Sequence, residues 1–136
     1  MNKMKKIIWI VGGIAVLIAI ILIGLRLFIG GGEDAWIKDN RGVWIKHGNP
    51  FSTPDYVTEQ QDAIDCVNEL YNKARDEGMN FSSQCLGSCG DYAVDVVRVP
   101  RTSDDNKPEN QCTDFREGKI KHFIELDKNG AIVRVV

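Results

Sequence analysis

The pattern of hydrophobic and polar residues divides the chain into an apolar N-terminal segment and a mixed remainder. Nineteen residues from Ile7 to Leu25 carry no charge, and the apolar run continues past one arginine to Ile29. A helix of about 20 apolar residues spans the hydrocarbon core of a bilayer. The pattern therefore predicts a single transmembrane helix at 7–29 in contact with the lipid bilayer, preceded by a basic flank at 1–6.

The charges on either side of this run predict its orientation. Lys3, Lys5 and Lys6 precede it, whereas Glu33 and Asp34 follow it. Basic residues bias their flank to the cytoplasm, so the N-terminus is expected inside and the remainder outside the cell membrane. A cleaved signal peptide is the alternative, but its apolar region is typically about 7–15 residues long, which favours an uncleaved signal anchor.

After a glycine-rich linker at 30–34, the pattern predicts one extracytoplasmic domain at 35–136. Apolar residues at helical spacing predict an amphipathic helix over Pro54–Glu77. Aromatic and β-branched residues around a turn predict a hairpin over Trp36–Lys46, at the edge of the fold or near the membrane. Three further strands are expected, at Tyr92–Val99, Lys119–Leu126 and Ala131–Val136. The predicted fold class is α+β, with the helix packed on an antiparallel sheet.

The two remaining stretches, Met79–Gly90 and Pro100–Gly118, are predicted to be loops. The first holds Asn80-Phe81-Ser82, which matches the N-glycosylation acceptor pattern and has meaning in a host that modifies its exported proteins. The second is polar and acidic, but the spacing of its acids matches no known calcium loop. A solvated acidic loop is therefore expected there.

Charge narrows the classes of partner. The whole chain carries a net charge of −2, with seventeen basic and nineteen acidic residues. All the acids lie after Gly32, and four of the basic residues lie before it. Residues 30–136 therefore contain thirteen basic and nineteen acidic residues, which gives a net charge of −6. Such a domain lacks the basic surface that nucleic acids and anionic lipids attract. No nucleic-acid partner and no cofactor is predicted.

The cysteines point to disulfides. Cys66, Cys85, Cys89 and Cys112 all lie in the segment expected outside, and an even count in a small exported domain indicates bridges. We predict that Cys66 bonds to Cys85 or Cys89 and that the remaining one bonds to Cys112. A local Cys85–Cys89 bridge is the alternative. Cys66 borders the apolar helix face and is expected to point toward the core.

Candidate chemistry is sparse. No hydrolase motif is present, Cys85 and Cys89 lack redox spacing, and no metal site is predicted. Asp95 lies in an apolar strand, where a buried carboxylate needs a partner, and a structural ion pair is expected. His122 is expected to be half-buried and hydrogen-bonded. Trp36 and Trp44 form a candidate platform for a ligand, although packing on the core or proximity to the membrane is the expectation we favour.

One short stretch resembles known sequences. Trp44 to Pro50 reads Trp-Ile-Lys-His-Gly-Asn-Pro and resembles a Trp-x-Lys-His-Gly-x-Pro stretch of small membrane-anchored proteins from archaea and candidate bacterial phyla. The resemblance covers about one-twentieth of the chain. It implies a location at the cell surface and no particular activity.

Three functions remain as hypotheses. The first is a membrane-tethered domain that binds a ligand outside the cell or assists an envelope complex through a protein partner. The second is a pilin-like or pseudopilin-like filament subunit, which the glycines after the apolar run disfavour. The third is a small enzyme that uses Asp95, His122 or a free cysteine. The sequence favours the first and predicts no catalytic residues.

Overall fold

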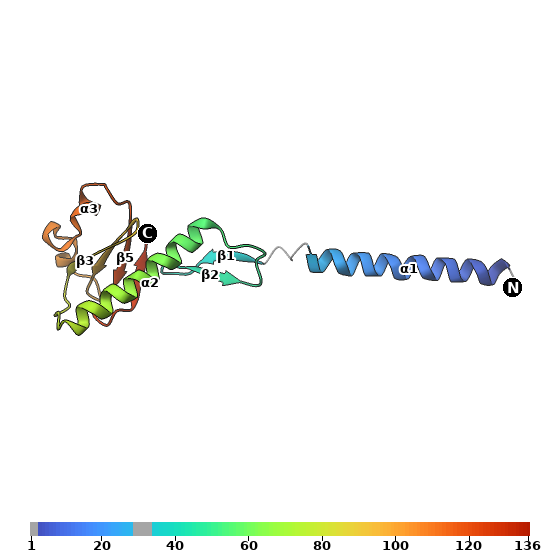
Figure 1. Ribbon diagram of the computed structural model, residues 1–136, viewed down its shortest axis with the longest axis horizontal. Helices are drawn as coiled ribbons and strands as arrows, with labels where there is room; N and C mark the ends of the chain where they lie inside the picture. Colours follow the sequence, from blue (N-terminus) through green and yellow to red (C-terminus); the bar gives the residue numbers. More distant parts are fainter. Residues whose placement is uncertain (1–2, 29–33) are drawn as a thin grey trace. The chain divides into compact units, whose positions relative to one another are not determined.

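The computed structural model describes residues 3–28 and 34–136 (Figure 1). Most of the predicted linker at 30–34 lies outside the described residues. In chain order, the elements are α1 (Lys3–Phe28), β1 (Ala35–Lys38), β2 (Trp44–His47), α2 (Asp55–Asp76), β3 (Gln84–Cys89), β4 (Tyr92–Val96), η1 (Ser103–Asn106), η2 (Pro108–Asn110), α3 (Thr113–Arg116), β5 (His122–Leu126) and β6 (Ile132–Val135).

The N-terminal apolar segment is helical. Within α1, the stretch Lys3–Arg26 is long and apolar enough to cross a membrane. Its apolar side chains are exposed, with Trp9 exposed to 79%. A helix with so many exposed apolar side chains needs an apolar environment. Transmembrane anchors and signal sequences share this length and apolar composition. The helix begins at Lys3, before the predicted span at 7–29, so part of the basic flank is helical as well.

The chain divides into two compact units. One comprises Met1–Ala35 and Lys46–Phe51, and the other comprises Trp36–Ile45 and Ser52–Val136. The second unit contains α2 and the four-stranded sheet. The turn of the predicted hairpin also belongs to it, because the Val135 amide donates a hydrogen bond of 2.7 Å to the Arg41 carbonyl. The expectation that this hairpin lies at an edge of the fold is confirmed, since Val135 is in the edge strand β6.

The four-stranded sheet has the order β3-β4-β5-β6 and is mixed. The outer pairs β3–β4 and β5–β6 are antiparallel, whereas the central pair β4–β5 is parallel. The prediction of a fully antiparallel sheet is therefore wrong at its centre. The physical reason is the long segment between β4 and β5, which carries the chain back to the end of the sheet where β4 began.

Strand β3 is missing from the prediction, which placed a loop over Met79–Gly90. Its sequence, Gln-Cys-Leu-Gly-Ser-Cys, contains few residues with a strong strand preference. The strand pairs with β4, and its register shifts between Cys85 and Gly87 at a bulge. Two of its residues are cysteines in disulfides, so cross-links as well as pairing hold it in place.

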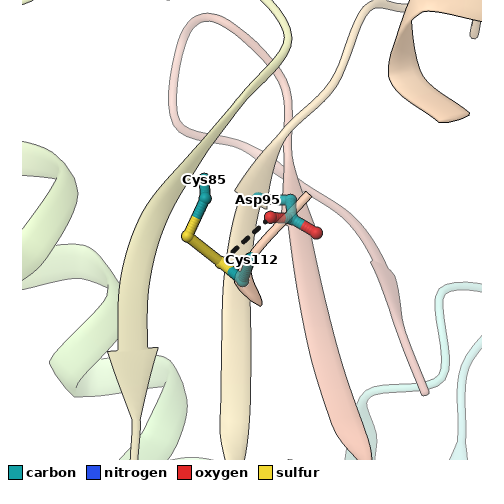
Figure 2. Close-up of side chains that lie close together, drawn as sticks. All are labelled: Cys85, Asp95 and Cys112. Atoms are coloured by element: carbon teal, nitrogen blue, oxygen red, sulfur yellow. Dashed lines mark hydrogen bonds between the residues drawn. A yellow bond between two sulfur atoms is a disulfide. The ribbon is translucent and has the colours of Figure 1, made fainter. Parts of the chain in front are cut away.

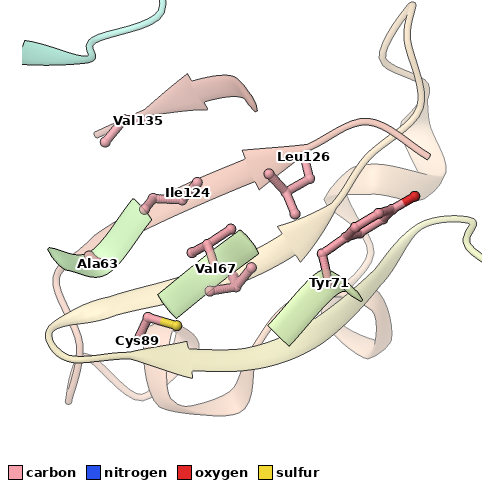
Figure 3. Packing of buried hydrophobic residues seen from close by; sticks show 8 residues of the cluster. Ala63, Val67, Tyr71, Cys89, Ile124, Leu126 and Val135 are labelled. Carbon is pink, nitrogen blue, oxygen red and sulfur yellow. The ribbon is translucent and has the colours of Figure 1, made fainter. Parts of the chain in front are cut away.

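Helix α2 packs across one face of this sheet, as predicted (Figure 3). Figure 3 shows Ala63, Val67 and Tyr71 of the helix in front of the sheet, near Ile124 and Leu126. Tyr71 also donates a hydrogen bond of 2.9 Å from its hydroxyl to the Lys128 carbonyl. The helical period of the apolar residues was sufficient to identify this core face.

The opposite face of the sheet is covered by the segment between β4 and β5. This predicted loop contains three short helical turns, η1, η2 and α3. Asp105 in η1 is 3% exposed. Burial alone would raise the pKa of its carboxyl, but hydrogen bonds from the Thr102 and Arg98 backbone amides outweigh burial and lower the pKa to about 2. The segment is thus an ordered cover for the sheet.

Candidate functional site

A groove of about 750 Å³ lies beside α2 in the unit that contains the four-stranded sheet. The N-terminal half of α2, the hairpin, the turn between β3 and β4, and the start of β5 form its walls. Its size is in the range typical of sites for small ligands and peptide side chains. The lining residues used below are Lys38, Trp44, Tyr56, Glu59, Gln60, Asp62, Asp91, Tyr92 and His122.

Gln60 connects the hairpin to α2 on one side of the groove. Its side chain is 2% exposed, accepts a hydrogen bond of 2.7 Å from the Trp44 amide and donates one of 3.1 Å to the Gly42 carbonyl. A buried amide with both groups satisfied fixes the position of the strand that it contacts. Gln60 therefore holds the backbone of the hairpin at Gly42 and Trp44 against α2.

Trp44 and Tyr56 form the aromatic wall of the groove. Their ring centroids are 4.9 Å apart and their planes are inclined by 50°. The Lys38 ammonium nitrogen lies 5.1 Å from the Trp44 ring centroid, within the range of a cation–π contact. Of the predicted platform residues, Trp44 lines the groove. Trp36 does not, and its indole nitrogen instead donates a hydrogen bond of 3.1 Å to the Ser52 carbonyl.

Tyr92, His122 and Asp91 form a second cluster of groove residues. The Tyr92 and His122 rings lie 5.2 Å apart, and His122 Nε2 is 3.9 Å from a carboxylate oxygen of Asp91. Burial raises the pKa of Tyr92, and the carboxylates of Glu59 and Asp91 raise it further, against the opposing effect of the Gln60 side chain. The His122 side chain is 49% exposed, so it is half-buried as expected, but its contact with Asp91 is longer than a hydrogen bond. His122 is the first residue of β5 and lies at the rim of the groove, where α2 no longer covers the sheet.

The disulfides join Cys66 to Cys89 and Cys85 to Cys112. The predicted connectivity is confirmed, and the alternative Cys85–Cys89 bridge is wrong. Cys66 is exposed, contrary to the expectation that it points to the core, whereas Cys89 is 1% exposed. The Cys66–Cys89 bridge lines the groove. Since all four cysteines are oxidised, none is a free thiol for nucleophilic chemistry.

Asp95 is buried, as predicted, with 8% exposure. Figure 2 shows its carboxyl beside the Cys85–Cys112 bridge, with Oδ1 3.1 Å from Cys112 Sγ. A disulfide sulfur carries no hydrogen, so a hydrogen bond between these atoms requires a protonated carboxyl as the donor. Burial raises the pKa of Asp95 to about 6, and the nearby Glu125 carboxylate adds to the rise, while a Cys112 backbone hydrogen bond and the Arg101 guanidinium oppose it.

The ion pair expected for Asp95 is formed instead by its neighbour. Among the described residues, Asp95 makes no ion pair, whereas Glu125, its register partner on β5, pairs with Arg101 and Arg134. Asp95, Cys85 and Cys112 bring potential metal ligands within 4.8 Å of one another. Because both sulfurs are used in the disulfide, this cluster lacks the thiolates that bind zinc.

Asp95 and His122 do not form a catalytic pair. His122 is paired in register with Tyr92, and Asp95 follows Tyr92 by an odd number of residues. Side chains alternate between the two faces along a strand, so Asp95 and His122 lie on opposite faces of the sheet. The residues proposed for an enzyme are therefore not assembled into one site.

The glycosylation pattern lies in an accessible place. Asn80 and Ser82 are both exposed in the connection between α2 and β3. Modification at Asn80 remains a prediction.

Most groove residues were not identified from the sequence. Tyr56, Glu59, Gln60 and Ala63 do follow a helical stripe, and this periodicity was the available signal on α2. Asp91 belongs to the turn between β3, which was predicted as a loop, and β4, of which Tyr92 is the first residue. Comparison with models of known families, with curated proteins and with solved structures gives no match.

Gln60 provides a test of how the groove is held. We expect Gln60→Leu to lower the free energy of unfolding by about 1–3 kcal/mol, because the Trp44 amide and the Gly42 carbonyl lose their partner. Urea unfolding followed by tryptophan fluorescence measures this. Gln61→Leu, the same change at the next helix position, is the control and should leave stability nearly unchanged. Equal losses for both variants would contradict the role of Gln60.

Proposed function

We propose that this protein is a membrane-tethered binding domain that recognises a ligand or envelope partner outside the cell through the groove beside α2. The observation that carries the proposal is the groove itself, a cavity of about 750 Å³ lined by three aromatic residues, Trp44, Tyr56 and Tyr92. Tyr56 is 50% exposed, although aromatic side chains usually have most of their surface buried in the protein. Exposed aromatic rings around a concave surface are typical of binding sites.

The location follows from two further features. The apolar helix α1 supports attachment to a membrane, and the two disulfides support an oxidising compartment. With a cytoplasmic N-terminus and the folded unit outside, both features are satisfied at once. The proposed topology is therefore single-pass, with residues 35–136 outside the cell membrane.

The alternatives are less well supported. A pilin-like subunit would extend its apolar helix into the folded unit, whereas the first element after α1 in the part of the chain that the structure describes is a strand, β1. An enzyme would need an activated nucleophile in the groove, and the oxidised cysteines supply none, while Asp95 lies on the other face of the sheet. The His122–Asp91 contact of 3.9 Å is longer than a hydrogen bond and has no nucleophile beside it among the groove residues. Binding is the function that the arrangement of side chains supports best.

Thiol labelling tests the proposed location. We expect no cysteine to react with an alkylating reagent, either in intact cells or after lysis without reductant, and we expect mass spectrometry to map two bridges. Protease added to intact cells or spheroplasts should digest the folded unit while leaving the N-terminal flank protected. Four reactive thiols, or a folded unit protected from protease, would contradict an extracytoplasmic domain.

Photocrosslinking tests the use of the groove. A photoreactive amino acid in place of Tyr56, within the groove, should give a reproducible adduct in cells. The matched control is the same substitution at Glu69, which is also exposed on α2 but does not line the groove. Adducts at both positions alike, or at neither, would contradict binding through the groove.

A further inference from the structure

The groove carries more negative than positive charge around its aromatic rings. Three carboxylates line it, those of Glu59, Asp62 and Asp91, against one lysine and one histidine. All three acids are exposed to solvent, and of the three only Asp91 has a basic neighbour in the groove wall, His122 at 3.9 Å. Carboxylates around a concave apolar surface produce a local negative potential that attracts cations.

The aromatic wall already holds a cation from the protein itself. The ammonium group of Lys38 lies over the Trp44 ring at 5.1 Å from the centroid. Aromatic faces carry partial negative charge, so an ammonium or guanidinium group is favoured there. Trp44 and Tyr56 are inclined by 50°, which makes a corner rather than a flat surface. A corner of two rings can surround a cation, whereas a sugar ring stacks best on a flat face.

We propose that the groove binds a basic peptide segment of a partner protein and places a lysine or arginine side chain between the Trp44–Tyr56 corner and the carboxylates of Glu59 and Asp91. This inference rests on the proposed function, since it names the ligand class of the same groove. The apolar stem of such a side chain packs on the rings, while its charged end reaches the carboxylates. The acidic character of residues 30–136 as a whole, at −6, favours the encounter with a basic segment.

Lys38 has a definite place in this proposal. Its ammonium group lies over the Trp44 ring, which the side chain of the ligand would contact, and its positive charge repels a cationic ligand. Binding must therefore displace Lys38 from Trp44. Removing this charge is expected to strengthen binding of a basic peptide and to weaken binding of an anionic ligand, so the sign of the effect distinguishes the two.

The experiment uses the full-length chain in nanodiscs of phosphatidylcholine, a zwitterionic lipid that does not attract basic peptides by charge. The probe is the acetylated and amidated peptide Leu-Lys-Leu-Lys-Leu, titrated by calorimetry, with empty nanodiscs as the blank. Its counterpart with norleucine in place of lysine keeps the apolar stem and removes the charge. We expect the lysine peptide to bind, with an affinity that falls as salt is raised, and the norleucine peptide to bind much more weakly.

Variants locate the site. Glu59→Gln and Asp91→Asn should each weaken binding of the lysine peptide by about two- to fivefold, and Lys38→Met should strengthen it by a similar factor. Glu69→Gln, which removes an exposed acid of the same helix outside the groove, should change nothing. The gain expected for Lys38→Met cannot arise from misfolding, so it keeps the test decisive if another variant is unstable.

Several results would overturn the proposal. These are equal binding of the lysine and norleucine peptides, equal losses for Glu59→Gln and Glu69→Gln, or weaker binding by Lys38→Met. Spermidine binding as tightly as the peptide would indicate a free polyamine, and a maltooligosaccharide binding in its place would indicate a carbohydrate site. An adduct at Tyr56 in cells without peptide binding in nanodiscs would reject the ligand class and leave the binding function standing.

Discussion

Replacing Cys66 and Cys89 together by alanine is expected to lower the free energy of unfolding by about 3–4 kcal/mol. The bridge joins residues 23 positions apart, and cross-links that close loops of this length restrict the unfolded chain by about that amount. It also ties α2 to β3, a strand whose residues have little strand preference of their own. Alanine is chosen because Cys89 is buried, and a serine hydroxyl would add an unsatisfied group there.

Urea unfolding of the full-length chain in detergent micelles, with and without reductant, measures this effect. The Cys85→Ala/Cys112→Ala pair should lose a similar amount, since that bridge joins residues 27 positions apart. Ser88→Ala, an exposed change in the same strand, is the control and should be nearly neutral. If the wild type keeps its stability in reductant and both double variants match the wild type, the bridges do not stabilise the fold.

The parts of the fold that sequence predicted well are those determined by local periodicity. The apolar segment at the N-terminus and α2 each carry a regular pattern, and their predicted bounds differ from the observed ones by a few residues. The last two predicted strands were also identifiable, because the residues between them, Asp127 to Gly130, are of types that suit a tight turn. Asp127 there accepts hydrogen bonds from the Asn129 and Ala131 amides.

The parts that sequence did not predict depend on contacts between distant segments. Strand β3 is specified by pairing and cross-links rather than by composition. The parallel pairing of β4 with β5 depends on the path of the connection between them, and nothing in either strand signals its direction. The groove brings together the hairpin, α2, the Asp91 turn and His122, which are far apart in the chain. No spacing rule connects such positions.

Asp95 lies between these cases. Its apolar neighbours in the sequence correctly predicted that Asp95 is buried, because a strand that is covered on both faces has no solvent-exposed position for a charged residue. The partner was not predictable, since it depends on the strand alignment. Glu125, which is paired in register with Asp95, forms ion pairs with both Arg101 and Arg134. Asp95 lies next to a disulfide instead.

This arrangement predicts that Asp95 makes stability fall as pH rises. In the folded state the pKa of Asp95 is about 6, against an ordinary value of 3.8, so between these values the folded chain holds a proton that the unfolded chain has released. The stabilisation from the protonated carboxyl is fully present below pH 3.8 and is lost as pH rises through 6. The loss amounts to about 3 kcal/mol, since each pKa unit corresponds to about 1.4 kcal/mol.

Asp95→Asn isolates this effect, because the amide has nearly the same shape and does not ionise. We expect the variant to be about 2–3 kcal/mol more stable than the wild type above pH 7, and the two to converge toward pH 4. The comparison, made by urea unfolding at a series of pH values, cancels other groups such as Asp105, whose lowered pKa gives the opposite slope below pH 4. Asp65→Asn, at an exposed position, should follow the wild type throughout. A constant difference between Asp95→Asn and wild type at every pH would mean that Asp95 does not change its ionisation on folding.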